Sequence, residues 1–391
     1  MERGAHLFNS NPLVHTKQVR WYWLEHMPKR AKCTMRDVAR LAGVSTTTVS
    51  AVINETVTVS PQRKKKVLDA MAALDYHPDS VARSLKTGKT NVIGVVVPDI
   101  TNVFYPEVVR GVEEAAGLAG YSVVLCDSGE DPKLEDRHLA TLFSRRVEGV
   151  LLACCAGSTA YDTMVRRRFP MVFIDRLPPA AAEGTVSTDN VQAGYIAAKH
   201  LIDLGHIRIA MVAGHLELSS HHDRLEGFRK AMQECHLPIR DEFLKAAVEG
   251  KCFDGDVQVE NGLDAGRQLL GLSTLPTAII ANNNKLLLGV VQALEEGRIQ
   301  VPGQLSVVGF DDYIWNRYFN PSLTAIAQPT HEMGKRAFEL LLTIVNRRPG
   351  EELAERNVRL AAELRVRNST GAPPPESKKL GNSSAEAIAS R

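Results

Sequence analysis

The chain has 391 residues, of which 44% are apolar and 24% are charged. A chain of this length exceeds one ordinary core, which predicts two or three compact units. The sequence contains no apolar run near the roughly 18 residues that cross a bilayer, and its N-terminus lacks the features of a secretory signal. These features exclude a membrane-spanning protein and indicate a soluble protein of the cytoplasm.

The net charge of +2 conceals an asymmetry along the chain. Residues 28–90 carry twelve basic and five acidic side chains, a net charge of +7, whereas the residues from 91 onward carry a net charge of −6. A small basic segment on a larger acidic body suggests that the segment binds a polyanion such as nucleic acid. Charge alone leaves the alternative of a merely solvated helix surface.

Six scattered cysteines form no C-x-x-C pair, so reduced structural thiols are expected. Cys154 and Cys155 lie in the run GVLLACCAG, which is typical of a buried strand. A second group of potential ligands is unevenly spaced in an expected loop, which disfavours a metal site. It comprises His215, His221, His222 and Asp223. We therefore expect neither a metal nor another cofactor.

In chain order, the first predicted elements are three helices within residues 34–78. Gly43 breaks the first helix in a tight turn, Ser45 is a good N-cap for the second, and Ser60 with Pro61 begins the third. The expected apolar faces are Val38, Ala39, Leu41 and Ala42, then Val49, Val52 and Ile53, then Val67, Leu68, Met71 and Leu74. Two short helices joined by a glycine turn and covered by a third predict an all-α helix-turn-helix head.

The threonine run at residues 46–48 opens the second helix, although threonine is a mediocre helix former. In a helix-turn-helix unit, this end of the second helix lies in the major groove of DNA. A threonine there offers a short donor and acceptor, and a methyl group for the thymine methyl. We expect these hydroxyls to face DNA, although a generic pair of amphipathic helices shows the same periodicity.

From Asn91 onward, short apolar strands alternate with helices. The runs VIGVVVP, VEGVLLACC and TAIIANN are apolar on both faces, like parallel strands buried between helix layers. Two such sets follow one another, which predicts an α/β body of two lobes with two parallel, doubly wound sheets. Ligands of such sheets bind where the carboxyl ends of the strands face a crevice, here expected between the lobes.

Side chains near the expected strand ends are the candidate ligand-binding residues. They are Phe104, Tyr105, Asp175, Arg176, Arg224 and Asn284. Each also has a purely structural interpretation. A Phe-Tyr pair at a helix start commonly belongs to a core, and Asp175 beside Arg176 suits a local ion pair.

Several long stretches of the sequence carry a family signature. They include DVARLAGVSTTTVSAVIN, VSPQRKKKVLDAMAALDYHPDSVARSLKTGKTNVIGVVVPDITNVFYPEVVRGVE, RLEGF and VPGQLSVVGFDD. In these words the chain closely resembles the lactose-repressor and galactose-repressor (LacI/GalR) family of bacterial transcription regulators, over residues 34–368. The resemblance implies a type I periplasmic-binding-protein-like body that binds a small-molecule effector, and a homodimer that binds double-stranded operator DNA.

The resemblance also implies a hinge helix, in which Leu85 is an apolar wedge between base pairs in the minor groove. The expected DNA-binding residues are Thr34, Ser45, Thr46, Thr47, Thr48, Ser50, Ala51, Asn54, Arg83, Leu85 and Lys86. Ala51 stands where arginine or histidine is frequent in the family. We therefore expect a different half-site, because a small side chain cannot reach a guanine bidentately.

For the effector, the resemblance favours Arg224 most, since an arginine three residues before that glycine commonly clamps hydroxyls or carboxylates. Two candidates depart from the family pattern. Asn284 stands where aspartate is frequent, and Val257 stands where an aromatic residue is frequent. We expect a sugar or sugar-derived effector, in a site that is not a plain copy of a sugar pocket.

The expected partition follows from these patterns. It comprises an N-terminal extension (1–33, with Met27 as an alternative start), the helix-turn-helix domain (34–78), hinge helix and linker (79–90), first lobe (91–188 and 324–350), second lobe (189–323 and 351–367) and a disordered tail (368–391). The tail has no leucine heptads, so no tetramer-forming coiled coil is expected.

The leading hypothesis is a ligand-responsive, DNA-binding homodimer that represses transcription and is not an enzyme. A transport-type solute-binding protein shares the two-lobed body, but the basic helical head and the missing signal peptide count against it. An enzyme that uses the cleft is the second alternative. Against it, the sequence has no nucleophile elbow, phosphate-binding glycine loop or paired-carboxylate motif.

Overall fold

The computed structural model describes residues 33–54, 58–77, 88–155, 157–178, 183–246, 255–348 and 350–375. The chain divides into two compact units, Met1–Lys89 and Thr90–Arg391, which we call the head and the body. Most of the predicted hinge lies outside the described residues, as does nearly all of the N-terminal extension. Within the described residues, the helices are too short or too polar to cross a membrane.

Three helices build the head, namely α2 (Met35–Ala42), α3 (Thr46–Asn54) and α4 (Pro61–Ala73). Gly43 ends α2 in left-handed backbone at φ 65°, a conformation that glycine adopts without strain. The inner faces of the three helices form one core of Val38, Ala39, Ala42, Val49, Val52, Val67 and Ala70. This arrangement is the predicted helix-turn-helix unit.

Two residues assigned to this core are instead exposed. Leu41 is 56% exposed and Leu68 is 48% exposed. In α4 the buried stripe runs through Val67, Ala70 and the partly buried Met71, at i, i+3 and i+4 spacing. The small Ala70 therefore occupies the inner position that the sequence analysis gave to Leu68.

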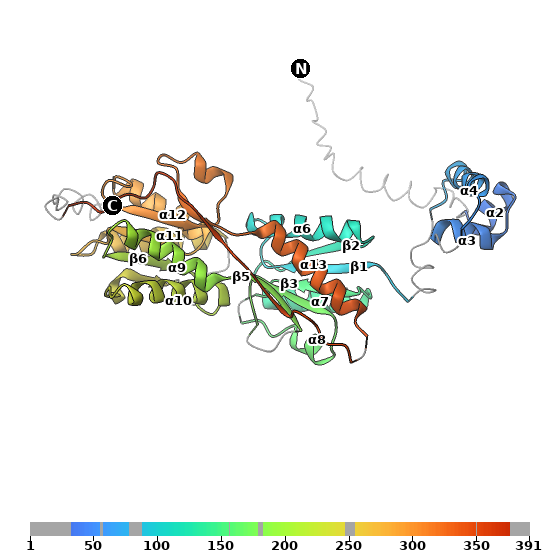
Figure 1. Ribbon diagram of the computed structural model, residues 1–391, viewed down its shortest axis with the longest axis horizontal. Coiled ribbons are helices and arrows are strands. Elements are labelled where there is room, and N and C mark those ends of the chain that lie inside the picture. The colour runs from blue at the N-terminus through green and yellow to red at the C-terminus, as the bar shows by residue number, and fades with distance from the viewer. Residues whose placement is uncertain are drawn as a thin grey trace, which may run out of the picture. The chain divides into compact units, whose positions relative to one another are not determined.

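Two six-stranded sheets form the body (Figure 1). Every described strand pair is parallel except β10 with β12. The first sheet has the order β11 (Asn357–Leu360), β5 (Gly184–Thr188), β4 (Met171–Ile174), β3 (Gly149–Leu152), β1 (Val92–Val97), β2 (Ser122–Asp127). The second has the order β12 (Glu363–Arg365), β10 (Thr324–Ala327), β9 (Ser306–Phe310), β8 (Ala278–Ala281), β6 (Ile209–Ala213), β7 (Leu244–Ala246).

Helices cover both faces of each sheet (Figure 1). Successive strand residues point to opposite faces: Val95 belongs to the core beneath α6 and α13, and Val96 to the core beneath α7. The first sheet carries α6 (Phe104–Leu118), α7 (Pro132–Ser144), α8 (Asp162–Arg166) and α13 (Thr330–Asn346). The second carries α9 (Asn190–Asp203), α10 (Ser219–Glu234), α11 (Gly255–Leu270) and α12 (Asn284–Glu296), with 3-10 turns at Asp241–Phe243 and Ile314–Arg317.

The chain passes between the two sheets three times, from β5 to α9, from β10 to α13 and from β11 to β12. The expected lobe boundaries are therefore wrong at two places. β10 pairs with β9 in the second sheet, although 324–350 was assigned to the first lobe. β11 pairs with β5 in the first sheet, although 351–367 was assigned to the second. These two strands have only four residues each, too few for a clear sequence pattern.

The C-terminal segment is ordered further than expected. The Ser369 hydroxyl donates to the Val307 carbonyl at 2.7 Å and accepts from the Thr324 backbone N–H at 2.8 Å. A ring nitrogen of the buried His206 lies 2.9 Å from the Gly371 carbonyl. Predicted disorder is thus wrong for residues 368–375, which pack on the second sheet, and residues 376–391 lie outside the description.

Candidate functional site

The hydroxyl side chains predicted to bind DNA at the N-terminal end of α3 are of two kinds: some cap the helix and others are exposed. Ser45 Oγ accepts from the Thr48 backbone N–H at 3.1 Å and lies 2.9 Å from Thr48 Oγ1. These two side chains therefore cap the helix. Thr46 and Thr47 are exposed. The structure thus leaves two threonines of the run with side chains available to a ligand of the head.

Exposed basic side chains accompany them in the head. These basic residues are Arg36, Arg40, Arg63, Lys64, Lys65 and Lys66. Thr34 is tied to the start of α2, because its backbone N–H and hydroxyl donate to Asp37 Oδ2 at 3.0 and 2.6 Å. The Thr34 hydroxyl is the main reason that the pKa of Asp37 is lowered. Ser50 and Ala51 are partly buried. The predicted residues Arg83, Leu85 and Lys86 and the side chain of Asn54 lie outside the described parts of the chain.

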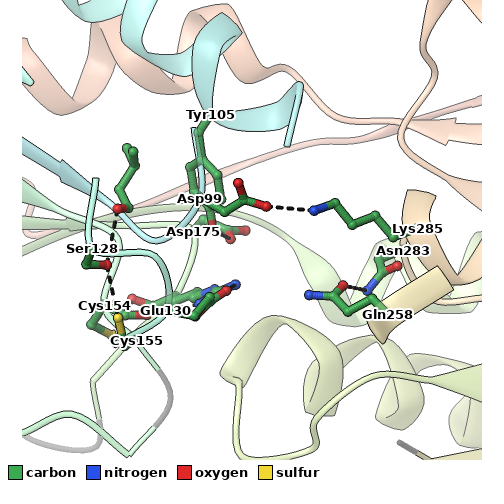
Figure 2. Close-up of polar contacts among 12 residues, drawn as sticks. Asp99, Tyr105, Ser128, Glu130, Cys154, Cys155, Asp175, Gln258, Asn283 and Lys285 are labelled. Atoms are coloured by element: carbon green, nitrogen blue, oxygen red, sulfur yellow. Dashed lines mark hydrogen bonds and ion pairs between the residues drawn. The ribbon is translucent and has the colours of Figure 1, made fainter. Parts of the chain in front are cut away.

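In the body, a buried charged cluster lies at the carboxyl ends of the strands of the first sheet. Asp175 and Arg176 directly follow β4, and Tyr105 lies in the first turn of α6. The Tyr105 hydroxyl donates to Asp175 Oδ2 at 3.3 Å, and Figure 2 shows the two side chains close together, with Glu130 below them in the view. The carboxyl ends of neighbouring parallel strands meet at one edge of a sheet, which is why residues far apart in sequence come together here.

Arg176 pairs with Glu130 and not with its neighbour Asp175. Its Nη1 and Nη2 donate to the two Glu130 carboxylate oxygens at 2.8 and 2.7 Å. Both side chains are almost fully buried, and Nη1 also donates to the Cys154 carbonyl at 3.3 Å. The local Asp175–Arg176 ion pair considered from the sequence is therefore replaced by a bidentate pair between two loops, a strong and directional contact.

The second sheet contributes Arg224, which lies in α10. Its Nε donates to Asn190 Oδ1 at 2.8 Å and its Nη1 donates to the Asn282 carbonyl at 2.7 Å. The guanidinium carbon lies 4.5 Å from the centre of the Phe310 ring. Arg224 is only 3% exposed, so these contacts fix its charge in a buried position.

Two aspartates occupy equivalent places in the two sheets. Asp175 follows β4 with φ 61°, and Asp311 follows β9 with φ 70°. The backbone N–H of Asp175 donates to the Val186 carbonyl at 3.0 Å, and that of Asp311 donates to the Ile326 carbonyl at 2.9 Å. Left-handed backbone is uncommon outside glycine and gathers at functional sites.

Burial dominates the electrostatics of this pair. It raises the pKa of Asp175, against the opposing attraction of Arg224 and then Arg176. It also raises the pKa of Asp311, where Arg224 again opposes the shift. Since Arg224 acts on both carboxyl groups, and Asp311 acts on Asp175, the polar groups of the two sheets form one electrostatic unit.

Two further contacts join the first and second sheets at this site. Asn284 Nδ2, at the start of α12, donates to Asn102 Oδ1 at 3.0 Å. Lys285 Nζ donates to Asp99 Oδ2 at 2.6 Å (Figure 2). Burial raises the pKa of Asp99, but hydrogen bonds from Lys285 and Thr101 outweigh burial and hold that pKa below its usual range.

Comparison with known proteins matches both units of this chain. The family model of bacterial regulatory proteins of the lacI family matches residues 34–79, and that of the periplasmic binding protein-like domain matches residues 198–370. The HTH-type transcriptional repressor PurR of Photobacterium profundum is 37% identical over 338 residues, which cover 86% of this chain and 98% of the relative. The chain belongs to the LacI/GalR family.

Solved structures of LacI/GalR relatives agree with the fold. The lac repressor dimer bound to operator and the anti-inducer ONPF is 26% identical, covers 87% of this chain and 99% of its own, and gives a TM-score of 0.75. A LacI family regulator from Enterococcus faecium with bound ribose is 31% identical and covers 73% of this chain and 100% of its own, with a TM-score of 0.62. The helix-turn-helix head and the type I periplasmic-binding-like body are thus shown.

The structure gathers most, but not all, of the predicted effector residues of this LacI/GalR protein. Tyr105, Asp175 and Arg176 lie in one buried network, and Arg224 interacts with Asp175 across it. Phe104 is buried in the hydrophobic core of the first sheet, edge-on to the Tyr105 ring at 5.1 Å. Val257 is partly buried in α11, and no described contact connects it with the cluster.

Several polar members of the site were not predicted from the sequence. Glu130, Asp311 and Lys285 follow strands β2, β9 and β8, so the rule about strand ends points to them also. His221 was considered only as a metal ligand, and it is instead buried beside Arg224 and Arg176. Within the described residues, no group of three metal-ligating side chains is present.

Proposed function

We propose that this LacI/GalR protein is a repressor of transcription that binds palindromic operator DNA as a homodimer and responds to a small-molecule effector. The observation that carries the proposal is the pairing of two units in one chain. One is a basic helix-turn-helix head with exposed Thr46 and Thr47 at the start of α3. The other is a two-sheet body with a buried charged cluster at its strand ends. No catalytic activity is proposed, and the protein acts where its DNA is, in the cytoplasm.

In the head, Thr46 and Thr47 contact base edges or phosphates in the major groove, which the start of a recognition helix enters. The Ser45 and Thr48 side chains support them by capping the helix. The exposed arginines and lysines of the head neutralise phosphates, which gives affinity without sequence preference. Thr34, Ser50, Ala51 and Asn54 complete the proposed surface. Arg83, Leu85 and Lys86 are proposed to contact the minor groove through the hinge.

In the body, the effector contacts Tyr105, Asp175, Arg176, Arg224 and Asn284. These residues come from both sheets, so an effector that touches them favours one arrangement of the lobes over another. The relatives bound to ONPF and ribose support a sugar-like effector as the starting hypothesis. Phe104 supports the site from the core, and Val257 is retained as a peripheral candidate.

Operator binding tests the proposal directly. The purified chain is used to select fragments from genomic DNA, and the enriched fragment and a scrambled version are then titrated by fluorescence anisotropy at fixed salt. We expect binding to the enriched fragment to be at least about a thousandfold tighter than to the scrambled one. Equal affinity for both would contradict the proposal.

Removing the hydroxyls of Thr46 and Thr47 together tests their role as base readers. The double alanine variant should lose about 1–3 kcal/mol of operator preference for each lost base contact, while non-specific binding changes little. Thr58→Ala is the matched control, because Thr58 is an exposed threonine of the head outside α3. A double variant that discriminates as well as the parent would make these threonines ordinary helix residues.

A further inference from the structure

Five exposed arginines gather where α7 and α8 end, at the amino-terminal edge of the first sheet. α7 leads into β3 and α8 leads into β4, and these two strands are parallel neighbours, so both turns enter the sheet from the same edge. The effector cluster lies at the opposite, carboxyl edge. The five residues, which we call the arginine surface, are Arg145, Arg146, Arg166, Arg167 and Arg168.

Packing between the two helices joins these arginines into one surface. Leu142 of α7 and Met164 of α8 belong to the same core on one face of the sheet. At the ends of the helices, the rings of Phe143 and Phe169 meet edge-on with their centres 5.6 Å apart. The guanidinium carbon of Arg167 also lies 5.6 Å from the centre of the Phe143 ring. The arginines that follow α8 are therefore held against the end of α7.

The positive charge of the arginine surface is not neutralised within the part of the chain that the structure describes. There, none of the five arginines forms an ion pair with a carboxylate. The carboxylate of Glu148 accepts instead from the Asn91 backbone N–H at 2.7 Å and the Tyr121 hydroxyl at 2.8 Å. Residues 143–170 carry five basic and two acidic side chains, a net charge of +3, whereas the residues from 91 onward carry −6. A local excess of cations on an acidic body favours an anionic partner.

The arginine surface adjoins the point at which the chain enters the body. Thr90 is the first residue of the body and directly follows the head in sequence. Its hydroxyl donates to the Arg146 carbonyl at 2.9 Å. An anion bound by the head and continuing past it is therefore the partner within closest reach along the chain. Guanidinium groups suit such a partner if it is DNA, because they pair with phosphate oxygens through two parallel N–H bonds.

We propose that the arginine surface binds the phosphate backbone of DNA that flanks the operator, which gives the body a DNA contact of its own. This inference rests on the proposed function, because the head must first bring the body to its operator. Phosphate contacts carry no base information, so the surface adds affinity and leaves sequence preference to the head. Its position beside the entry of the chain favours DNA over an acidic protein as the partner.

Two fragments of the enriched DNA test the proposal with the full chain. The shorter fragment carries the palindromic core alone, and the longer one adds about one helical turn, roughly ten base pairs, at each end. Fluorescence anisotropy gives the Kd of each fragment at several salt concentrations. The longer fragment should bind at least about tenfold more tightly, with a steeper dependence of log Kd on log salt, because more phosphates are contacted.

Replacing Arg166, Arg167 and Arg168 by glutamine together should remove most of this advantage. The salt slope on the longer fragment should fall by about 0.9 for each phosphate contact that is lost. The longer enriched fragment and a scrambled fragment of the same length should weaken by the same factor, since no base contact changes. The matching lysine variant keeps the charges and should keep most of the advantage. Circular dichroism reports the folding of each variant.

A second triple glutamine variant controls for net charge. It replaces Arg229, Arg240 and Arg298, which are exposed arginines among the elements of the second sheet. This control should bind the longer fragment like the parent. Equal weakening by the two glutamine variants would overturn the proposal, and so would a lysine variant as weak as its glutamine counterpart.

An acidic protein partner would give a different result. In that case the first glutamine variant would bind both fragments with the Kd and the salt slope of the parent, which would also overturn the proposal. Failure of the proposed function is distinguishable from these outcomes. The parent chain would then bind the enriched and the scrambled fragments equally well at either length.

Discussion

Asp175 and Asp311 are the residues at which the two halves of the body depart most from ordinary backbone. Each directly follows a strand, has positive φ, and donates its backbone N–H to a carbonyl of the adjacent strand. Such residues persist only where their surroundings hold them in place. Here the positive charge of Arg224 stabilises the ionised form of both buried carboxyl groups and so opposes the effect of burial on their pKa values. Arg224 therefore supports the fold as well as the effector site.

Truncation of Arg224 should accordingly destabilise the protein. Arg224→Ala removes the cation facing Asp175 and Asp311, and should lower the free energy of unfolding by about 3–5 kcal/mol. Urea unfolding followed by circular dichroism measures the change. Arg229→Ala on the same helix is the control, because Arg229 is 44% exposed and its pair with Glu226 should contribute no more than about 1 kcal/mol. Equal losses in the two variants would contradict a structural role for Arg224.

His206 provides a pH-dependent test of the ordered C-terminal segment. Burial lowers its pKa, and its ring nitrogens lie near Thr277 Oγ1 at 2.9 Å and the Gly371 carbonyl at 2.9 Å. Below about pH 6.5 the unfolded chain binds a proton that the folded chain resists, so stability falls as the pH drops through this window and is retained above it.

His206→Gln should therefore show a smaller loss of stability between about pH 7 and pH 5.5 than the parent does. The urea midpoint measured across this range gives the slope for each protein. His222→Gln, at a half-exposed position in α10, is measured alongside as the control substitution. A His206→Gln slope equal to that of the parent would show that His206 does not carry this proton linkage.

At the scale of elements, three pairs of helices pack unusually closely, and in each pair both helices have a glycine at the point of contact. The α9–α10 pair is typical: a Cβ on Gly194 would lie 2.0 Å from the Arg224 carbonyl oxygen, and one on Gly227 would lie 1.9 Å from the Val191 carbonyl oxygen. Gly111 with Gly334 does the same for α6 and α13, and Gly262 with Gly289 for α11 and α12. These backbones approach so closely that no side chain fits between them.

Gly194→Ala should therefore cost about 1–3 kcal/mol or more of stability, because the helices must separate to admit a methyl group. The movement would also displace the backbone of Arg224, so the effector Kd should weaken. Gly117→Ala in α6 is the control, since a Cβ there meets nothing within 4 Å and alanine favours a helix by about 1 kcal/mol. Thermal unfolding of both variants decides the matter, and a neutral Gly194→Ala variant would show that the helices separate freely.

The elements that the sequence predicted correctly are those with strong internal patterns. The run VIGVVVP marks β1, and Ser45 and Gly43 mark the turn between α2 and α3. The missed strands β5, β10, β11 and β12 are three to five residues long, and their pairing is set by neighbours far away in the sequence. The paired glycines were invisible for the same reason, since each matters only because of a helix found elsewhere in the chain. Leu41 and Leu68 show that an apolar residue on a short helix need not face the core.

At the scale of the whole molecule, the candidate site was also predicted only where its residues follow a local sequence pattern. The rule that ligands lie at strand ends found Asp175, Arg176 and Asn284 without any coordinates. It did not distinguish Glu130 as the partner of Arg176, because that choice depends on how two loops pack. The burial of His221 in this cluster was not predicted either; burial first, then Arg224 on the same helix and Arg176 from the first sheet, lower its pKa.

Across the body, the three segments that cross between the sheets are bonded to one another. Thr188 Oγ1 donates to Gln328 Oε1 at 2.7 Å, and the Asp189 backbone N–H donates to the Leu360 carbonyl at 2.9 Å. The cluster that contains Arg224 and Asp175 draws residues from both sheets. An effector bound there would act on both lobes at once, which is how a ligand can alter DNA binding without touching DNA.

The coupling between effector and operator tests this account most directly. The probe is a sugar or base that stabilises the protein in a thermal-shift screen. The operator Kd is measured by anisotropy with and without saturating probe, and the probe Kd by calorimetry with and without operator, at one salt concentration. The two constants should change by the same factor, roughly 5- to 150-fold, because coupling between two sites is reciprocal. An operator Kd that stays the same at saturating probe would contradict it.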